Sequence, residues 1–128
     1  MKVKVRVRVF KTSWFTKAAK KARISDAALC KAMVQVMAGK ADDLGGGVFK
    51  KRLAANQLRS IILARGRDLW VYQFLFAKQD RSNIDNDELK AFKLLAKTYG
   101  KMATEQVNAQ VADGHWIEIC AEGVERPA

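Results

Sequence analysis

The residues of this chain best suited to chemistry are four cations in the stretch VFKKRLAANQLRS, residues 48–60. Apolar residues flank Lys50, Lys51, Arg52 and Arg59 in a pattern typical of a half-buried hairpin. No Asp or Glu occurs from residue 44 to residue 67, so the group has no carboxylate nearby in the sequence. Arginine offers a two-pronged hydrogen-bonding fork, so a phosphate group is a natural counterion. A solvated basic face is the alternative interpretation.

The register of the expected hairpin decides which of these cations lie together. With a two-residue Asn-Gln turn, Arg52 lies opposite Ile61 and Lys50 lies opposite Leu63. Residues directly opposite one another share a face, so Lys50, Arg52 and Arg59 are predicted to converge on one surface. The other face would carry apolar residues that suit a core, namely Phe49, Leu53, Leu58 and Ile62.

A second turn decides whether an aromatic residue joins these cations. A turn centred on residues 66 and 67 would bring Tyr72 and its even-numbered neighbours, Trp70 and Phe74, to the cationic face. A three-residue loop would bring the odd-numbered residues of the same strand there instead. Tyr72 is therefore a candidate for this face, and the two alternatives remain open.

Positive charge is concentrated in the first half of the chain. Residues 1–64 hold 15 Lys and Arg against 3 Asp, whereas residues 65–128 hold 9 Lys and Arg against 10 acidic residues. A field of this sign attracts polyanions, and nucleic acid is the favoured partner. A basic surface kept for solubility or for an acidic protein is the alternative.

The N-terminal stretch alternates basic residues with valines from Lys2 to Val9, which predicts a half-buried strand with a basic face. Such charges protect a sheet edge from pairing with another molecule, and we favour that role. Phosphate binding by the same face, with Lys4 among its cations, is the alternative.

The remaining patterns predict a single α+β domain over residues 1–128, with an N-terminal helical hairpin and C-terminal helices packed on a small antiparallel sheet. Ser13 and Ser25 are expected to cap the first two helices, and Trp14 belongs to an apolar stripe expected in the core. Gly39 would end the second helix. The other predicted elements are strands at 48–55, 58–65 and 69–77, helices from 85 or 86 to 99 and from 104 to about 112, and a strand-like HWIEI segment.

Several features narrow the function further. Cys30 and Cys120 form no CxxC motif and His115 is the single histidine, so we predict neither a zinc site nor a disulfide, and expect both cysteines to be packing residues. His115 is expected to be a packing or surface residue.

No apolar run is long enough to span a membrane, and the start does not look like a secretory signal. We therefore expect a cytoplasmic protein.

The order of the predicted elements resembles that of toxins of the RelE/HigB family of type II toxin-antitoxin systems. This order is a strand, two helices, GGGVFKKRL, a turn, RSIIL, a strand ending in FLFAK, the polar stretch QDRSNID and a helix. The resemblance covers residues 7–100, followed by a C-terminal helix and strand-like extension over 101–120. It implies a RelE-like fold and a ribonuclease that cuts mRNA in the ribosome. It also implies a cognate antitoxin, with the ribosome and mRNA as further partners, and neither a metal nor another cofactor. Such enzymes use the 2′-hydroxyl of the RNA itself.

Matched by motif, Lys50 and Arg52 fall on two basic positions of the family, and Arg59 falls on its phosphate-clamping arginine. The chain departs from some members at Gln79 and at Asp85, where they carry an arginine and a tyrosine. Arg81 could replace the missing cation, while Tyr72 or Asp85 could transfer a proton, although Asp85 also suits a helix cap. The predicted catalytic residues are therefore Lys50, Arg52, Arg59, Tyr72 and Arg81, and the predicted RNA-binding residues are Lys51, Arg65 and Lys78.

Two other functions remain open at this point. Relatives of the same fold, the ParE-like proteins, inhibit DNA gyrase and lack nuclease activity, and they would not need cations clustered on the sheet. A non-enzymatic RNA-binding module would usually place aromatic stacking residues among its cations. The stretch from Lys50 to Arg59 contains no aromatic residue, which argues against the second alternative.

Overall fold

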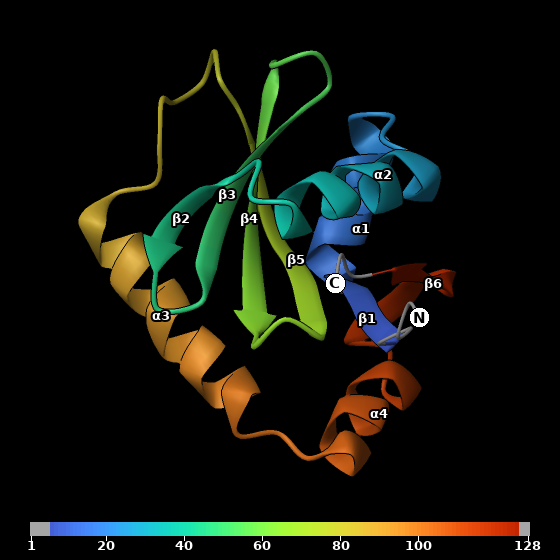
Figure 1. Cartoon of the computed structure of the whole chain (residues 1–128). Coiled ribbons are helices and arrows are strands. Elements are labelled where there is room, and N and C mark those ends of the chain that lie inside the picture. Colours follow the sequence, from blue (N-terminus) through green and yellow to red (C-terminus); the bar gives the residue numbers. More distant parts are fainter. Residues whose placement is uncertain (1–5, 126–128) are drawn as a thin grey trace.

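The computed structural model describes residues 6–125, which form four helices and six strands (Figure 1). In chain order the elements are β1 (Arg6–Thr12), α1 (Ser13–Lys21), α2 (Asp26–Met37), β2 (Asp42–Gly45), β3 (Val48–Leu53), β4 (Leu58–Arg65), β5 (Leu69–Ala77), α3 (Asn86–Gly100), α4 (Thr104–Ala112) and β6 (Trp116–Glu125). The strands at 48–55, 58–65 and 69–77 were predicted within two residues of their ends, because their apolar runs are separated by clear turn residues.

All six strands belong to one mixed sheet, in the order β2-β3-β4-β5-β1-β6. β1 pairs with β5 in parallel and with β6 in antiparallel orientation. The prediction of an antiparallel sheet with an N-terminal helical hairpin is therefore wrong. A strand of the sheet comes first, and the α1 and α2 helices that follow it form a crossover connection, which allows a later strand to run parallel to β1.

β1 is an interior strand, so the predicted role of its cations as edge protection is also wrong. Its described apolar side chains are buried. Arg8 donates hydrogen bonds from Nε and from a terminal nitrogen to the two carboxylate oxygens of Glu118 on β6, at 3.0 and 2.9 Å. This hydrogen bonding raises the pKa of Arg8. Lys2 and Lys4 lie outside the described residues.

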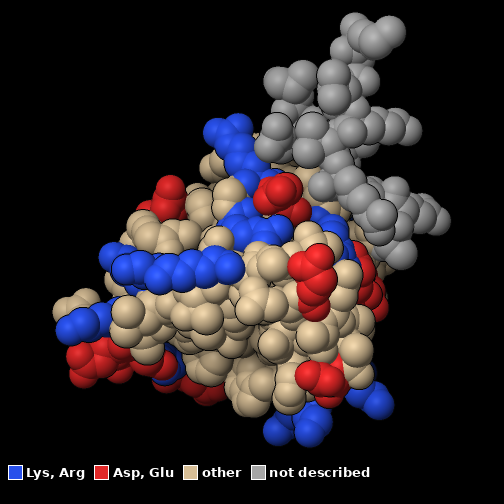
Figure 2. All heavy atoms as spheres, turned by 90° about the horizontal axis from the view of Figure 1, so that it is seen from below, with Lys and Arg blue, Asp and Glu red and all other residues tan. Residues whose placement is uncertain are grey.

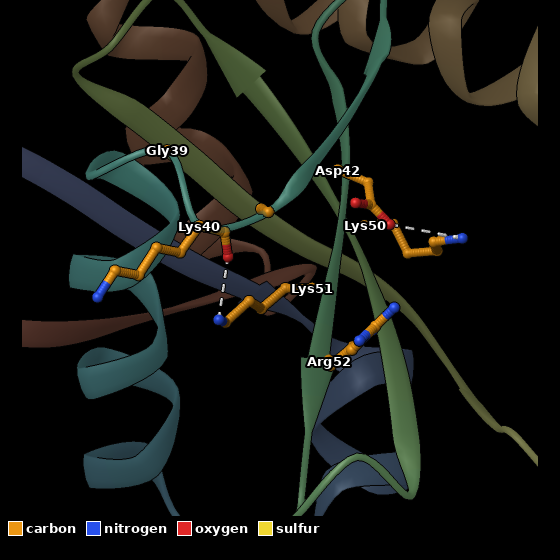
Figure 3. Close-up of a pocket in the computed structure, with 7 residues that line it drawn as sticks. Gly39, Lys40, Asp42, Lys50, Lys51 and Arg52 are labelled. Carbon is orange, nitrogen blue, oxygen red and sulfur yellow. Dashed lines mark hydrogen bonds and ion pairs between the residues drawn. The ribbon is translucent and has the colours of Figure 1, made fainter.

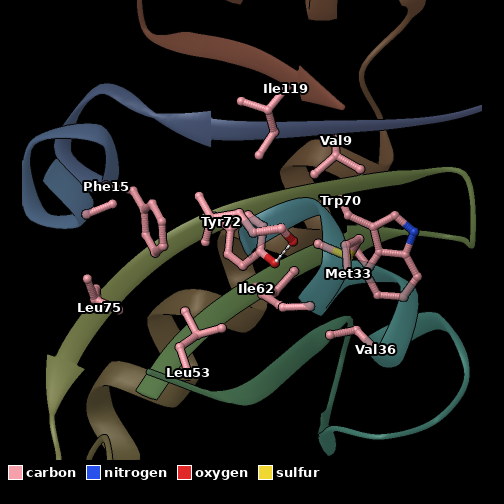
Figure 4. Close-up of a cluster of buried hydrophobic side chains, with 14 of the residues drawn as sticks. Val9, Phe15, Met33, Val36, Leu53, Ile62, Trp70, Tyr72, Leu75 and Ile119 are labelled. Atoms are coloured by element: carbon pink, nitrogen blue, oxygen red, sulfur yellow. Dashed lines mark hydrogen bonds between the residues drawn. The ribbon is translucent and has the colours of Figure 1, made fainter. Parts of the chain in front are cut away.

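Helices cover both faces of the sheet and give two apolar cores. Helices α1 and α2 pack on one face, where Met33, Ile62 and Tyr72 are fully buried (Figure 4). Helices α3 and α4 contribute to a second core, which also includes Ile61 and Phe76 of the sheet. Neighbouring residues of one strand, such as Ile61 and Ile62, therefore point into different cores, as the strand period of two requires.

The caps of two helices were predicted correctly. Ser25 caps α2, and Asp85 caps α3 through a capping box with Glu88. In α1 the cap is Thr12, one residue before the predicted Ser13. The short strand β2 was missed, because its sequence contains two aspartates and a glycine, residues that strands disfavour.

Cys30 and Cys120 form a disulfide, with their Cα atoms 5.6 Å apart, so the prediction of two free packing cysteines is wrong. The bond joins α2 to β6 across a sequence separation of 90 residues. Its existence depends on the position of β6 beside β1, which local sequence patterns do not reveal.

Candidate functional site

The β3–β4 hairpin brings the three predicted cations to one face, in a register different from the expected one. Its turn has four residues, 54–57, and Arg52 lies directly opposite Arg59 while Lys50 lies opposite Ile61. Compared with a two-residue turn, the partner of each β3 residue moves by two positions. Because side chains alternate with a period of two, each residue keeps its face, and Lys50, Arg52 and Arg59 share one surface as predicted.

Lys50 and Arg52 differ in their surroundings. The Lys50 Nζ donates a hydrogen bond to Oδ1 of Asn83 at 3.3 Å and lies 3.8 Å from a carboxylate oxygen of Asp42. Lys50 thus links the hairpin to the segment between β5 and α3. The Arg52 side chain is exposed and forms no hydrogen bond or ion pair with any residue that the structure describes. Its guanidinium can therefore bind a phosphate without first breaking another contact.

Arg59 is only 7% exposed. Its guanidinium donates to the carbonyl oxygens of Asn56 at 2.9 Å and Leu58 at 3.2 Å, both close to the turn. Ala54, Ala55 and Asn56 adopt positive φ angles there, a conformation that alanine rarely adopts. Arg59 therefore stabilises an unusual turn in addition to facing the other cations.

Arg59→Ala should therefore lower the free energy of unfolding by about 1.5–3 kcal/mol, the usual worth of hydrogen bonds to a charged group. Urea denaturation measures this change. Arg52→Ala is the matched control, because Arg52 is the cross-strand neighbour of Arg59 but is exposed. Equal stability of the two variants would contradict the structural role of Arg59.

A hollow of about 350 Å³ lies at the β3 edge of this surface, where α2 ends and β2 begins (Figure 3). Lys50 and Arg52 point to one side of β3, and Lys51 points to the other side, towards residue 40 (Figure 3). The Lys51 Nζ donates to the carbonyl oxygen of Lys40 at 3.0 Å. Burial and, to a smaller extent, the charge of Lys40 lower the pKa of Lys51. Lys51 therefore lines the same hollow without joining the face of Lys50 and Arg52.

Arg81 lies over the cationic face from the segment that precedes α3. Its guanidinium carbon is 5.5 Å from the ring centroid of Phe76, and Phe76 is the cross-strand neighbour of Arg59. Arg81 also forms an ion pair with Glu88, which lowers the pKa of that carboxyl through their hydrogen bonds. Lys78 is exposed at the start of the same segment.

Two predicted site residues lie elsewhere. Arg65 is at the opposite end of β4 and donates to the carbonyl oxygen of Met102. Tyr72 is fully buried under α2, where its hydroxyl donates to the carbonyl oxygen of Leu29 at 2.6 Å (Figure 4). Burial raises the pKa of Tyr72. Neither side chain can reach a ligand held by Lys50 and Arg52.

The face on which Tyr72 lies follows from the length of a loop that the sequence left open, and a bulge beyond it sets the face of the next aromatic residues. The loop between β4 and β5 has three residues, 66–68, which excludes the two-residue turn. The pairing then shifts between Ile61 and Ile62, so that Phe74 lies opposite Ile61. Beyond this bulge the even-numbered residues Phe74 and Phe76 share the face of the cations.

Asp85 and His115 are not available for proton transfer at this site, because Asp85 caps a helix and His115 lies elsewhere. Asp85 accepts the backbone N–H of Glu88 at 2.7 Å as the cap of α3, which agrees with its predicted capping role. His115 is exposed where α4 leads into β6. The sequence analysis missed two residues of the site: Asn83, which contacts Lys50, and Phe76, which contacts Arg81. Only the phrase QDRSNID pointed to the segment that contains Asn83.

Charge is distributed differently at the opposite end of the molecule. Seen from below, that end shows Lys and Arg side chains mixed with Asp and Glu and separated by wide uncharged areas (Figure 2). Among the side chains that the structure describes, residues 7–120, no group of three or more His, Cys, Asp or Glu could hold a metal ion. No helix in the same range is long and apolar enough to cross a membrane.

The mixed sheet, with helices on both faces and an exposed basic hairpin, defines a small α+β protein suited to binding a polyanion. Residues 7–119 match the family described as the RelE toxin of the RelE/RelB toxin-antitoxin system. The chain therefore belongs to the RelE toxin family and is the toxin component of a toxin-antitoxin system. Members of this family are generally endoribonucleases that inhibit translation, and the system implies a cognate antitoxin. No curated protein matches the sequence.

Proposed function

We propose that this toxin is a ribosome-dependent endoribonuclease that cuts mRNA in the cytoplasm without a metal or another cofactor. Its partners are the ribosome, mRNA and the antitoxin, and the whole chain acts as one RelE-like domain. One observation carries the proposal: the Arg52 guanidinium is exposed and unpaired among the described residues, and it shares its face with Lys50. Such a pair is suited to the charge of a phosphate undergoing attack.

The protein must assist this reaction in three ways: it removes one proton, supplies another and stabilises negative charge. The 2′-oxygen of one nucleotide attacks the adjacent phosphorus, and the bond from phosphorus to the 5′-oxygen breaks, leaving a 2′,3′-cyclic phosphate and a 5′-hydroxyl. A proton leaves the 2′-hydroxyl, another reaches the 5′-oxygen, and negative charge grows on the phosphate oxygens. Arg52 stabilises this charge, with Arg81 as a second cation over the same face.

Lys50 is the group that we assign to proton transfer. Arginine side chains stay charged in proteins, so among Lys50, Arg52 and Arg59 only the lysine can give up and regain a proton. Its hydrogen bond with Asn83 holds the ammonium group on the side of β3 to which Arg52 also points. Asn83 would thus act as a positioning residue for Lys50.

Dependence on translation is the decisive test. The toxin is expressed without antitoxin, and primer extension is carried out on one message with its start codon and on the same message with that codon removed. We expect cuts only in the translated message, with 5′-hydroxyl ends downstream of each cut. Growth arrest without cuts would contradict the proposal and favour a gyrase inhibitor, and equal cutting of both messages would contradict ribosome dependence.

A further inference from the structure

Trp14 is a large aromatic side chain that the fold leaves in solvent. It was predicted to lie in the core, yet it is 50% exposed, whereas Trp70 and Trp116 are only 4% and 3% exposed. Its ring stacks on Phe74 with centroids 5.0 Å apart and planes 22° apart. Trp14 therefore has one face supported by protein and presents a rigid apolar surface to solvent.

Trp14 is one end of an aromatic row that leads to the cationic face. Phe74 lies 6.1 Å from Phe76 between ring centroids, and the guanidinium carbon of Arg81 lies 5.5 Å from the Phe76 ring. Phe92 of α3 supports Phe74 from another side at 6.0 Å. The row follows the end of β5 that extends beyond its pairing with β1, which stops at Tyr72.

The surroundings of Trp14 carry positive charge. Helix α1 contains three lysines and no acidic residue, and the exposed Lys17 lies one turn beyond Trp14. Lys11, two residues before α1, is held in an ion pair with Asp26. An exposed aromatic ring next to exposed lysines is a combination that binds single-stranded nucleic acid, through stacking on bases and attraction of phosphates.

We infer that Trp14 is a positioning residue that stacks on a base of the single-stranded RNA whose phosphate lies at Lys50 and Arg52. The inference rests on the proposed function for the class of substrate. The row from Arg81 to Trp14 gives the strand a path along the end of β5. Stacking tolerates every base, so this contact would strengthen binding without imposing a strong sequence preference.

Tryptophan fluorescence tests the contact directly, because the other two tryptophans of the chain are buried. The probe is a short single-stranded oligonucleotide with 2′-O-methyl groups, which the proposed reaction cannot cut. At low salt we expect it to quench the fluorescence of the full chain and to protect it from acrylamide. No quenching or protection would overturn the inference.

Substitutions give the second measurement, using anisotropy of the labelled oligonucleotide. Trp14→Ala should weaken binding about 5- to 150-fold, the range of a lost stacking contact, and Trp14→Phe should restore part of it. Leu94→Ala is the control, because Leu94 is 62% exposed and outside the aromatic row. In cleavage assays, Trp14→Ala should raise KM and leave kcat nearly unchanged. Binding equal to the wild type would overturn the inference.

Failure of the proposed function can be told apart from failure of this inference. Arg52→Ala should lose cleavage while its Trp14 fluorescence still responds to the oligonucleotide. A wild-type protein that shows quenching but no cleavage would support RNA binding by Trp14 and contradict the nuclease. Cleavage that is unaffected by Trp14→Ala, in both KM and kcat, would leave the nuclease in place and refute the stacking role.

Discussion

Arg52→Ala should reduce mRNA cleavage about 10²- to 10³-fold, the usual effect of removing one group that stabilises charge in a transition state. The expected loss is large because the Arg52 guanidinium is the cation of the hairpin face that is exposed and unpaired among the described residues. Stability should change by less than about 0.5 kcal/mol, since the side chain is on the surface. Primer extension measures the first effect and urea denaturation the second.

Arg67→Ala is the matched control for this prediction. Arg67 is an exposed arginine in the β4–β5 loop, at the end of the hairpin strands remote from Arg52, so its removal changes the net charge equally. We expect full cleavage from this variant. If a folded Arg52→Ala protein kept full activity, or if both variants lost it equally, the assignment of Arg52 to the reacting phosphate would be wrong.

The shared face of Lys50, Arg52 and Arg59 was predictable because it depends only on the alternation of side chains along a strand. The assumed turn was two residues too short, but an even shift does not change the face of any residue. The length of the turn was not predictable, since Ala54 and Ala55 adopt left-handed backbone conformations that their side chains disfavour.

Features that depend on contacts between distant parts of the chain could not be predicted from local sequence patterns. The parallel pairing of β1 with β5 joins strands separated by two helices and three strands. The face of Phe74 and Phe76 depends on a bulge between Ile61 and Ile62, which no residue type in the sequence indicates. The buried residues of α1 are Phe15 and Ala19, and the apolar stripe in the sequence did not distinguish Trp14 from them.

Reduction of the Cys30–Cys120 disulfide should lower the free energy of unfolding by about 2–4 kcal/mol. The bond closes a separation of 90 residues and joins α2 to β6, so it restricts the unfolded chain strongly. The effect is large compared with the total stability of a small domain, about 5–15 kcal/mol. Urea denaturation with and without a thiol reductant measures it.

A Cys30→Ala, Cys120→Ala double variant should have the stability of the reduced protein and show no response to reductant. Identical denaturation of the wild type under both conditions would contradict the disulfide. The result also bears on where the toxin acts, because the cytoplasm keeps most protein thiols reduced. In the proposed compartment the toxin would work with two thiols and a lower stability, and Lys50 and Arg52 would still share one face because that depends on the register of β3 and β4.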